Sequence, residues 1–231
     1  MGNIGKPHLS FVANHKPTIE KFIIFADCFR QGILATNQTK IVMIYINDHV
    51  QSLDVDDALA RVSAQRRELA LKFRHEGSRR LCLAAYLLLM DGLRRECFIE
   101  EPPIFGYSPE GKPFIVDHPD IQFNLSHSGN VAICAISNQP VGIDVETSRK
   151  ISDSLIDYTM NKWERKFIDA SDDKVTAFLE YWTKKEALLK LTGEGIRNDL
   201  KDVLMESENY LFESCMTDKY IYSIAKYRDV P

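Results

Sequence analysis

The chain has 231 residues, of which 45% are hydrophobic, and a formal net charge of −4 at pH 7. This acidic balance argues against a nucleic-acid binder, because such proteins usually carry a basic excess. The longest apolar run, residues 81–90, is far shorter than the ~20 residues that a membrane span needs. The five cysteines include no CxxC pair, so we expect a reduced, cytoplasmic protein without structural disulfides.

The first 40 residues follow no pattern that continues later in the chain. They mix Gly, Pro, His and Asn with one short apolar patch at residues 22–26. A β-rich run first appears at residues 41–46, and Met43 lies inside it. Our hypothesis is that translation naturally starts near Met43 and that residues 1–40 are a non-essential extension. The alternative is an accessory segment that packs on the domain.

The remainder of the first half predicts helices followed by short strands. Residues 62–73 and 78–95 carry apolar side chains at helical spacing, and Ser78 suits the N-cap position. Pro102 and Pro103 prevent the helix from continuing. We then expect short strands at residues 115–116, 121–123 and 131–136.

The second half repeats the order of the first, a strand followed by helices. It predicts a strand at residues 141–146, helices at 161–168 and 174–191, and a hairpin that pairs 210–212 with 220–224. The repeat favours an α/β (α+β) fold of two similar lobes, each a small sheet with packed helices, related by a pseudo-twofold axis. We place the first lobe at residues 41–136 and the second at 137–231. A cleft between two lobes is a natural place for a ligand.

Three carboxylates form the first candidate site. Asp144 and Glu146 alternate with aliphatic residues, so a strand would place both on one face. Glu186 and Lys190 are four apart, which aligns them along one side of a helix. If that helix crosses the strand, three hard oxygen ligands converge, and these suggest Mg²⁺ together with substrate phosphate. Taken singly, each pattern is more often a solvated face or a surface ion pair.

Four motifs occur in order over about a third of the chain: Gly111-Lys-Pro113, Phe123-Asn-Leu-Ser-His-Ser-Gly129, Asp144-Val-Glu146 and Trp182-Thr-Lys-Lys-Glu-Ala-Leu-Leu-Lys190. Together they resemble the signature of the 4'-phosphopantetheinyl transferase superfamily. The long segment before the first motif is similar to the larger, pseudo-dimeric, Sfp-like class.

The resemblance implies Mg²⁺-dependent transfer of 4'-phosphopantetheine from coenzyme A to a serine of an apo acyl or peptidyl carrier protein, with release of adenosine 3',5'-bisphosphate. Asp144, Glu146 and Glu186 would hold the metal. Glu186 is the most plausible acceptor of the serine proton, directly or through water, and Lys190 is suited to a phosphate oxygen. The carrier is typically acidic and helical. We expect a monomer with no nucleic-acid or membrane partner.

The motif around Ser126 and His127 predicts coenzyme contacts. Alone, this segment would more often be a turn with a half-exposed histidine. The resemblance implies that both residues contact coenzyme A, with His127 near its phosphates as a third catalytic residue beside Glu186 and Lys190. A serine nucleophile with His127 as its base is disfavoured, because the two residues are adjacent and no orienting acid is evident.

Basic residues of the first half would bind the nucleotide end of the coenzyme. The resemblance places Lys112 and Pro113 along the nucleotide, and basic side chains at its 3'-phosphate. Arg80 looks most like the family's arginine, and Arg66 is the second choice. One departure is Glu194, which stands in a Gly-rich turn where the family often has a basic residue.

Two other functions remain open on the sequence. Another Mg²⁺-dependent phosphate or pyrophosphate hydrolase would explain the carboxylates, but not the serine-histidine and Gly-Lys-Pro motifs together. A non-catalytic relative that only binds carrier proteins would be expected to lack a metal carboxylate or Lys190, and neither is lost here.

Overall fold

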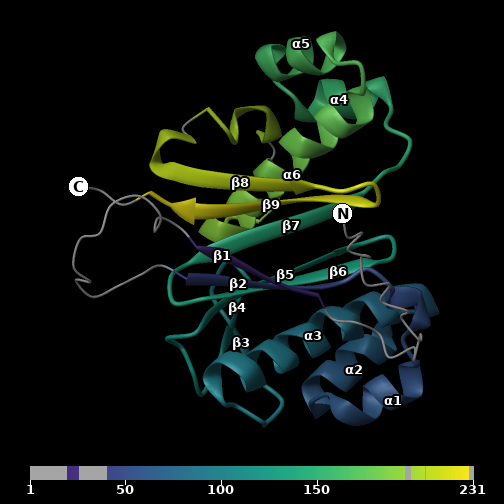
Figure 1. Cartoon of the computed structure of the whole chain (residues 1–231), viewed down its shortest axis with the longest axis vertical. Coiled ribbons are helices and arrows are strands. Elements are labelled where there is room, and N and C mark those ends of the chain that lie inside the picture. The colour runs from purple at the N-terminus through teal and green to yellow at the C-terminus, as the bar shows by residue number, and fades with distance from the viewer. Residues whose placement is uncertain (1–19, 26–40, 196–198, 206, 229–231) are drawn as a thin grey trace, which may run out of the picture.

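The computed structural model describes residues 20–25, 41–195, 199–205 and 207–228. These form four layers, in which two small antiparallel sheets pack face to face and a long helix covers each outer face (Figure 1). The predicted mixture of small sheets with packed helices is therefore confirmed. No helix in the described ranges is long and apolar enough to cross a membrane.

The first sheet and its helices come from the N-terminal half of the chain. Its strand order is β1 (Glu20–Phe25), β2 (Ile41–Asn47), β6 (Val131–Ser137) and β5 (Gln122–Ser128). Its helices are α1 (Val55–Arg61), α2 (Ala64–Lys72) and α3 (Glu76–Cys97), after the short 3₁₀ turn η1 (Val50–Ser52). The buried face of α3 packs on the sheet residues Met43, Tyr45 and Cys134. Strand β1 pairs with β2, and the rest of the predicted extension, residues 1–19 and 26–40, lies outside the described residues.

The second sheet repeats the arrangement of strands β2, β6 and β5 in the first sheet. Its strand order is β7 (Val141–Thr147), β9 (Tyr220–Tyr227) and β8 (Tyr210–Met216), and its helices are α4 (Asp153–Thr159), α5 (Lys162–Ala170) and α6 (Lys174–Thr192). Two 3₁₀ turns, η2 (Leu200–Asp202) and η3 (Ser207–Asn209), precede β8. From β2 onward, each half thus contains one strand, three helices and a hairpin, and the second hairpin strand lies between the other two strands. A further two-stranded ribbon, β3 (Phe105–Tyr107) and β4 (Pro113–Ile115), follows α3.

A close contact between α6 and β7 determines how near α6 lies to the second sheet. A Cβ atom on Gly142 would lie 1.9 Å from the carbonyl oxygen of Ala187, so only glycine permits this contact. Residues 142, 144 and 146 of β7 consequently face α6. The alternate residues Val141, Ile143 and Val145 face the first sheet and fill the core between the two sheets.

Strands β5 and β7 join the two sheets through side chains. The backbone N–H groups of Ile143, Val145 and Thr147 donate to Asn124 (3.0 Å), Ser126 (3.3 Å) and Ser128 (3.4 Å), respectively. Ser126 and Ser128 therefore lie within a strand, whereas the sequence predicted that their motif would fall between strands. Their hydroxyl groups can stay in a buried strand because they bind the backbone of the neighbouring one.

Candidate active site

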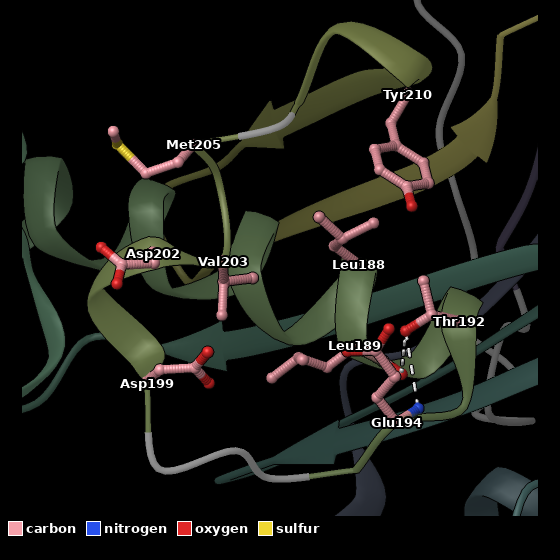
Figure 2. Close-up of a pocket in the computed structure, with 9 residues that line it drawn as sticks. All are labelled: Leu188, Leu189, Thr192, Glu194, Asp199, Asp202, Val203, Met205 and Tyr210. Carbon is pink, nitrogen blue, oxygen red and sulfur yellow. Dashed lines mark hydrogen bonds between the residues drawn. The ribbon is translucent and has the colours of Figure 1, made fainter.

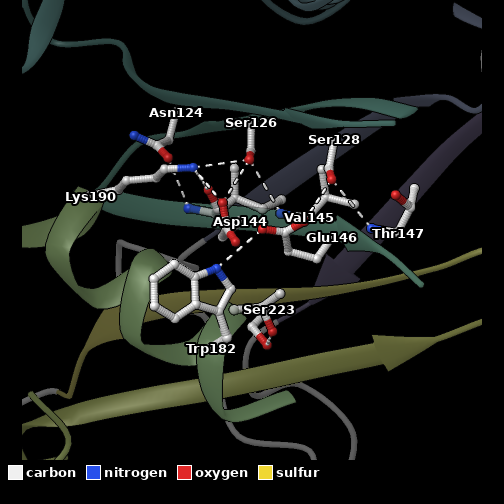
Figure 3. Close-up of polar contacts among 12 residues, drawn as sticks. Asn124, Ser126, Ser128, Asp144, Val145, Glu146, Thr147, Trp182, Lys190 and Ser223 are labelled. Carbon is white, nitrogen blue, oxygen red and sulfur yellow. Dashed lines mark hydrogen bonds and ion pairs between the residues drawn. The ribbon is translucent and has the colours of Figure 1, made fainter. Parts of the chain in front are cut away.

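The carboxylates of β7 are held by the serines of β5. Ser126 Oγ donates to Asp144 Oδ1 at 2.8 Å, and Ser128 Oγ donates to Glu146 Oε2 at 2.6 Å (Figure 3). Asp144 is 5% exposed, so its carboxylate is held in the interior, whereas Glu146 is nearer the surface. The regular two-residue spacing along both strands aligns each serine with one carboxylate.

Helix α6 contributes the second half of the cluster. Trp182 Nε1 donates to Glu146 Oε1 at 3.1 Å, and Lys190 Nζ lies 2.6 Å from Asp144 Oδ1. The same ammonium group donates to Ser126 Oγ at 3.0 Å and to the carbonyl of Ile143 at 3.3 Å. The stripe of residues four apart on α6 therefore faces β7, and the structure meets the condition that the sequence left open, that this helix crosses the strand (Figure 3).

Glu186 lies on the same stripe and shares the electrostatic field of the cluster. Burial raises the pKa of its carboxyl above the usual range, and the negative charge of Asp144 raises it further. Lys190 opposes this effect, and Glu146 adds to it more weakly. All three predicted carboxylates thus lie close enough to influence one another.

The carboxylate oxygens of this cluster are the kind of ligand that a hard cation prefers. Their present side-chain positions, however, do not form a complete set of ligands. In the described part of the chain, no three His, Cys, Asp or Glu side chains are arranged to hold a metal ion together. However, Asp144 Oδ2 is buried and has no hydrogen-bond partner, although its other oxygen is fully engaged. A buried oxygen left without a partner is a donor that a cation would satisfy. Side-chain movement of Glu146 or Glu186 would have to complete the ligand set.

A cavity of about 270 Å³ adjoins this cluster. It is lined by two sets of predicted residues, Lys112 and Pro113 from the first half and Glu186 and Lys190 from the second. Lys112 Nζ donates to the carbonyl of Leu191 at 2.8 Å, and burial lowers the pKa of its ammonium group. Asn124 also lines the cavity, and the sequence did not single it out. The cavity therefore brings the Gly-Lys-Pro motif and the α6 motif to one place.

The remaining predicted residues are divided between this region and the first-lobe helices. His127 is exposed, yet the surrounding protein partly desolvates its imidazole and lowers its pKa, and the positive charges of Lys190 and Arg66 act in the same direction. Arg66 is stacked over the rings of Tyr86 (4.7 Å) and Phe105 (5.1 Å). Arg66 therefore lies near enough to His127 to affect its protonation.

Arg80, the preferred choice on the sequence, has other partners. Its Nε atom donates to the carbonyl of Leu53 at 3.1 Å, and its guanidinium pairs with Glu76 one turn earlier. The structure thus offers Arg66 as the arginine whose charge reaches His127, while Arg80 ties α3 to the loop before α1.

Comparison with known proteins decides the family. A family model for the 4'-phosphopantetheinyl transferase superfamily matches residues 140–222. The 4'-phosphopantetheinyl transferase Sfp of Bacillus subtilis (strain 168) is 31% identical over 160 residues, which cover 68% of this chain and 71% of that protein. The chain belongs to the 4'-phosphopantetheinyl transferase superfamily. The extent of the match to Sfp also confirms the predicted Sfp-like class.

Two further relatives match shorter stretches of this superfamily member. The 4'-phosphopantetheinyl transferase HetI of Nostoc sp. (strain PCC 7120 / SAG 25.82 / UTEX 2576) is 41% identical over 100 residues, covering 40% of this chain and 42% of that protein. The 4'-phosphopantetheinyl transferase gsp of Aneurinibacillus migulanus is 40% identical over 95 residues, covering 40% and 39% of the two chains.

Lys185 is a buried residue of the family motif that the sequence reasoning did not single out. Its side chain is 0% exposed, and its ammonium group donates to Glu164 Oε2 (2.7 Å) and to the carbonyls of Thr159 (3.0 Å) and Leu200 (2.8 Å). Burial lowers its pKa, and Glu164 opposes that shift. Its spacing from the buried Leu189, one helical turn later, was the signal that would have predicted an inward position.

A second cavity of about 270 Å³ lies beside the last turns of α6 (Figure 2). Its lining includes Leu188, Thr192, Asp202 and Tyr210, together with Glu194, the residue that departs from the family pattern. None of the predicted coenzyme or metal residues of this transferase lines it. Glu194 is therefore turned toward a separate cavity from the one that holds Lys112 and Lys190.

Proposed function

We propose that the chain transfers 4'-phosphopantetheine from coenzyme A to a serine hydroxyl of an apo carrier protein. The observation that carries this proposal is the meeting of Asp144, Glu146, Glu186 and Lys190 beside the cavity lined by Lys112, in a chain that belongs to this superfamily. The released product would be adenosine 3',5'-bisphosphate, and acyl and peptidyl carrier proteins are the acceptor classes.

The metal proposed for this site is Mg²⁺, held by Asp144, Glu146 and Glu186. The orphaned oxygen of Asp144 supports a cation at this position, and so does the raised pKa of Glu186, which is due first to burial and then to the negative charge of Asp144. When bound, the ion would neutralise negative charge on the pyrophosphate. Carboxylate oxygens with no cysteine or histidine among them are the ligands that Mg²⁺ prefers.

The chain's own residues supply positioning and proton transfer. Lys190 would exchange its contact with Asp144 for a phosphate oxygen, because an ammonium group with acceptors on one side can turn to a stronger anion. Glu186 would accept the proton of the attacking serine, directly or through water, and its raised pKa favours that role at neutral pH. His127 and Ser126 would hold the coenzyme phosphates.

The nucleotide end of the coenzyme would extend toward the first lobe. Lys112 and Pro113 line the shared cavity, which supports their proposed contact with the nucleotide. Arg66 and Arg80 are the candidates for the 3'-phosphate, and the contacts that Arg80 makes with Leu53 and Glu76 favour Arg66. We further infer a cytoplasmic monomer in which residues 41–136 and 137–231 are the two lobes.

The test is an intact-mass assay with coenzyme A and purified apo carrier proteins of the acyl and peptidyl types. A mass gain equal to one phosphopantetheine arm, lost when Mg²⁺ is chelated, is the expected result. Hydrolysis of coenzyme A without any change in carrier mass would instead favour the pyrophosphate hydrolase. Carrier binding without turnover would favour the non-catalytic relative.

A further inference from the structure

Glu146 receives a contact from outside the β5, β7 and α6 cluster. Arg149 lies in the loop between β7 and α4, and its Nη2 atom is 3.2 Å from Glu146 Oε1. Trp182 donates to the same oxygen at 3.1 Å, and Ser128 donates to Oε2 at 2.6 Å (Figure 3). A carboxylate oxygen has about two acceptor positions, so Oε1 is fully engaged and Oε2 has one position left.

The fold holds these three donors with different firmness. Ser128 lies within β5, and its hydroxyl also accepts a backbone N–H of β7 at 3.4 Å. Trp182 lies within α6, where its indole stacks on Phe178 one turn earlier, with ring centroids 6.2 Å apart and planes at 12°. Arg149 belongs to no helix or strand, and its side chain is 48% exposed. Arg149 is therefore the donor that can leave the carboxylate with the least disturbance of the fold.

Charge also separates Arg149 from the other two donors. The indole N–H and the serine hydroxyl are neutral, so they orient the carboxylate of Glu146 without cancelling its charge. The guanidinium of Arg149 is permanently positive, so it competes with any other cation for the same carboxylate and repels that cation. The side chain of Glu146 is only 15% exposed, so this competition is screened less than at an open surface.

Asp144 shows the contrast with a carboxylate that keeps an oxygen open. Lys190 pairs with Asp144 Oδ1 at 2.6 Å, while Asp144 Oδ2 has no hydrogen-bond partner. A cation would thus find an open oxygen there without displacing Lys190. At Glu146, departure of Arg149 would open a position on Oε1, and Trp182 and Ser128 would still hold the carboxylate in place.

We propose that Arg149 is an internal competitor of the divalent cation, which pairs with Glu146 until Mg²⁺ takes its place. Arg149 thereby sets the Mg²⁺ concentration at which the site fills. The proposal rests on the proposed function and adds a means of regulating the same site. Mg²⁺ brings the same positive charge that Arg149 and Lys190 together withdraw when Lys190 turns to a phosphate oxygen. The exchange therefore leaves the net charge around the carboxylates nearly unchanged.

The main experiment is a calorimetric titration of the full chain with MgCl₂, comparing the wild type with Arg149→Gln. This variant should lower the Kd for Mg²⁺ roughly three- to tenfold, because an ion pair and a repulsive charge are both removed. The advantage over the wild type should shrink at high ionic strength, where the charge of Arg149 is screened.

The matched control is Lys150→Gln, which removes the same charge from the adjacent residue. Lys150 is exposed, and no hydrogen bond or ion pair joins it to any residue that the structure describes. Its removal should change the Kd for Mg²⁺ by less than about twofold, because an exposed charge without a direct contact is largely screened. Thermal unfolding should show that both variants fold normally, since both side chains lie on the surface.

A third variant, Trp182→Phe, should act in the opposite direction. It keeps a ring to stack on Phe178 but removes the N–H that holds Glu146. Loss of a hydrogen bond that orients a metal ligand typically weakens metal binding by roughly 10- to 100-fold. Two donors to the same oxygen would then have opposite effects on Mg²⁺ affinity, which a merely structural role of Arg149 would not produce.

The intrinsic fluorescence of Trp182 shows whether the ion binds beside Glu146. The chain has two tryptophans, so in a Trp163→Phe background the emission comes from Trp182 alone. Mg²⁺ should change this emission, and Arg149→Gln should shift the midpoint to lower Mg²⁺. The half-saturating Mg²⁺ concentration for carrier modification should fall by a similar factor, with the KM for coenzyme A unchanged at saturating Mg²⁺.

The outcomes separate this proposal from the proposed function. If the wild type modifies carriers with Mg²⁺ but Arg149→Gln has the same or a higher Kd, Arg149 does not compete and the proposal is overturned. Equal tightening by Arg149→Gln and Lys150→Gln would reduce the effect to general surface charge and would also overturn it. If the wild type neither binds Mg²⁺ nor needs it for carrier modification, the proposed metal site fails and the competition fails with it.

Discussion

The two lobes share a topology, but they differ in what the first strand presents to its covering helix. In the first lobe, β2 turns Met43 and Tyr45 toward α3, where both are buried in an apolar core. In the second lobe, β7 turns Asp144 and Glu146 toward α6. One fold therefore supports an apolar platform and a charged cluster, and the difference is confined to a few side chains on equivalent strands.

The comparison teaches where polar groups can be tolerated. Tyr45 is 0% exposed, and its hydroxyl donates to Glu96 on α3, so the single polar atom there is satisfied locally. Asp144 depends on Ser126 of the other lobe and on Lys190 of its own helix. The charged cluster thus requires both lobes, whereas the apolar core of the first lobe is closed within its own half.

The largest expected effect is a loss of activity on substitution of Asp144 in β7, compared with substitution of Tyr45 in β2. Asp144→Asn should reduce carrier modification by roughly 10³-fold or more, because it removes a charge proposed to hold the Mg²⁺ ion that would neutralise the reacting phosphates. Tyr45→Phe, at the equivalent side of β2, should leave kcat unchanged and cost about 1 kcal/mol of stability through one lost hydrogen bond. Initial rates and urea unfolding measure the two quantities. Comparable losses of activity in both variants would contradict the division of roles between the lobes.

The buried ion pair of the second lobe gives the next largest effect. Lys185→Met should lower the free energy of unfolding by about 3–5 kcal/mol, since it leaves Glu164 buried without its cation. Adding Glu164→Gln should recover part of that loss. The control is Lys184→Met, whose partly exposed i,i+4 pair with Glu180 contributes only about 0.5 kcal/mol. Equal losses for Lys185→Met and Lys184→Met in urea unfolding would refute the buried-pair interpretation.

The sequence predicts which residues share a face better than it predicts their partners. The alternation of Asp144 and Glu146 and the spacing of Glu186 and Lys190 predict that each pair shares one face of its element, but not that α6 packs on β7. The ion pair of Lys190 with Asp144 could not be predicted, because it depends on how closely α6 approaches β7. Gly142 permits this close approach, and no local sequence pattern shows which residues a glycine will contact in the folded protein.

The missed features have the same cause. Ser126 looked like a turn residue, because hydroxyl side chains favour turns when nothing across the sheet binds them. Lys185 was not singled out, because its buried acceptors come from α5 and from residues far along the chain. The family motifs located the site, whereas the contacts between lobes and helices required the fold.

Glycine positions sharpen the comparison of the lobes. A Cβ on Gly142 would lie 1.9 Å from a backbone oxygen of α6, whereas one on Gly92 would meet side chains, the flexible end of Ile136 at 2.4 Å and the ring of Tyr45 at 2.8 Å. Gly142→Ala should therefore destabilise the protein by about 1–3 kcal/mol or more, and Gly92→Ala by less, because a side chain can move aside and a helix backbone cannot. Gly142→Ala should also reduce activity by displacing Lys190. Chemical unfolding of the two variants measures this difference. A larger loss of stability for Gly92→Ala than for Gly142→Ala would contradict the close contact inferred between β7 and the backbone of α6.

The smallest effect concerns the pH dependence of stability. Glu186 has a pKa raised first by burial and then by the charge of Asp144, so the folded protein favours its protonated form. That contribution to stability is complete below the unfolded-state pKa of about 4.3 and is lost as pH rises through the higher folded-state pKa. Glu186→Gln removes the titration, so its stability relative to the wild type should increase with pH across this window. Urea unfolding in the presence of a metal chelator measures the difference, with Glu180→Gln as the control outside the cluster. A difference that stays constant with pH would mean that Glu186 does not feel its neighbours' charge, and the three carboxylates would then be too far apart to share one cation.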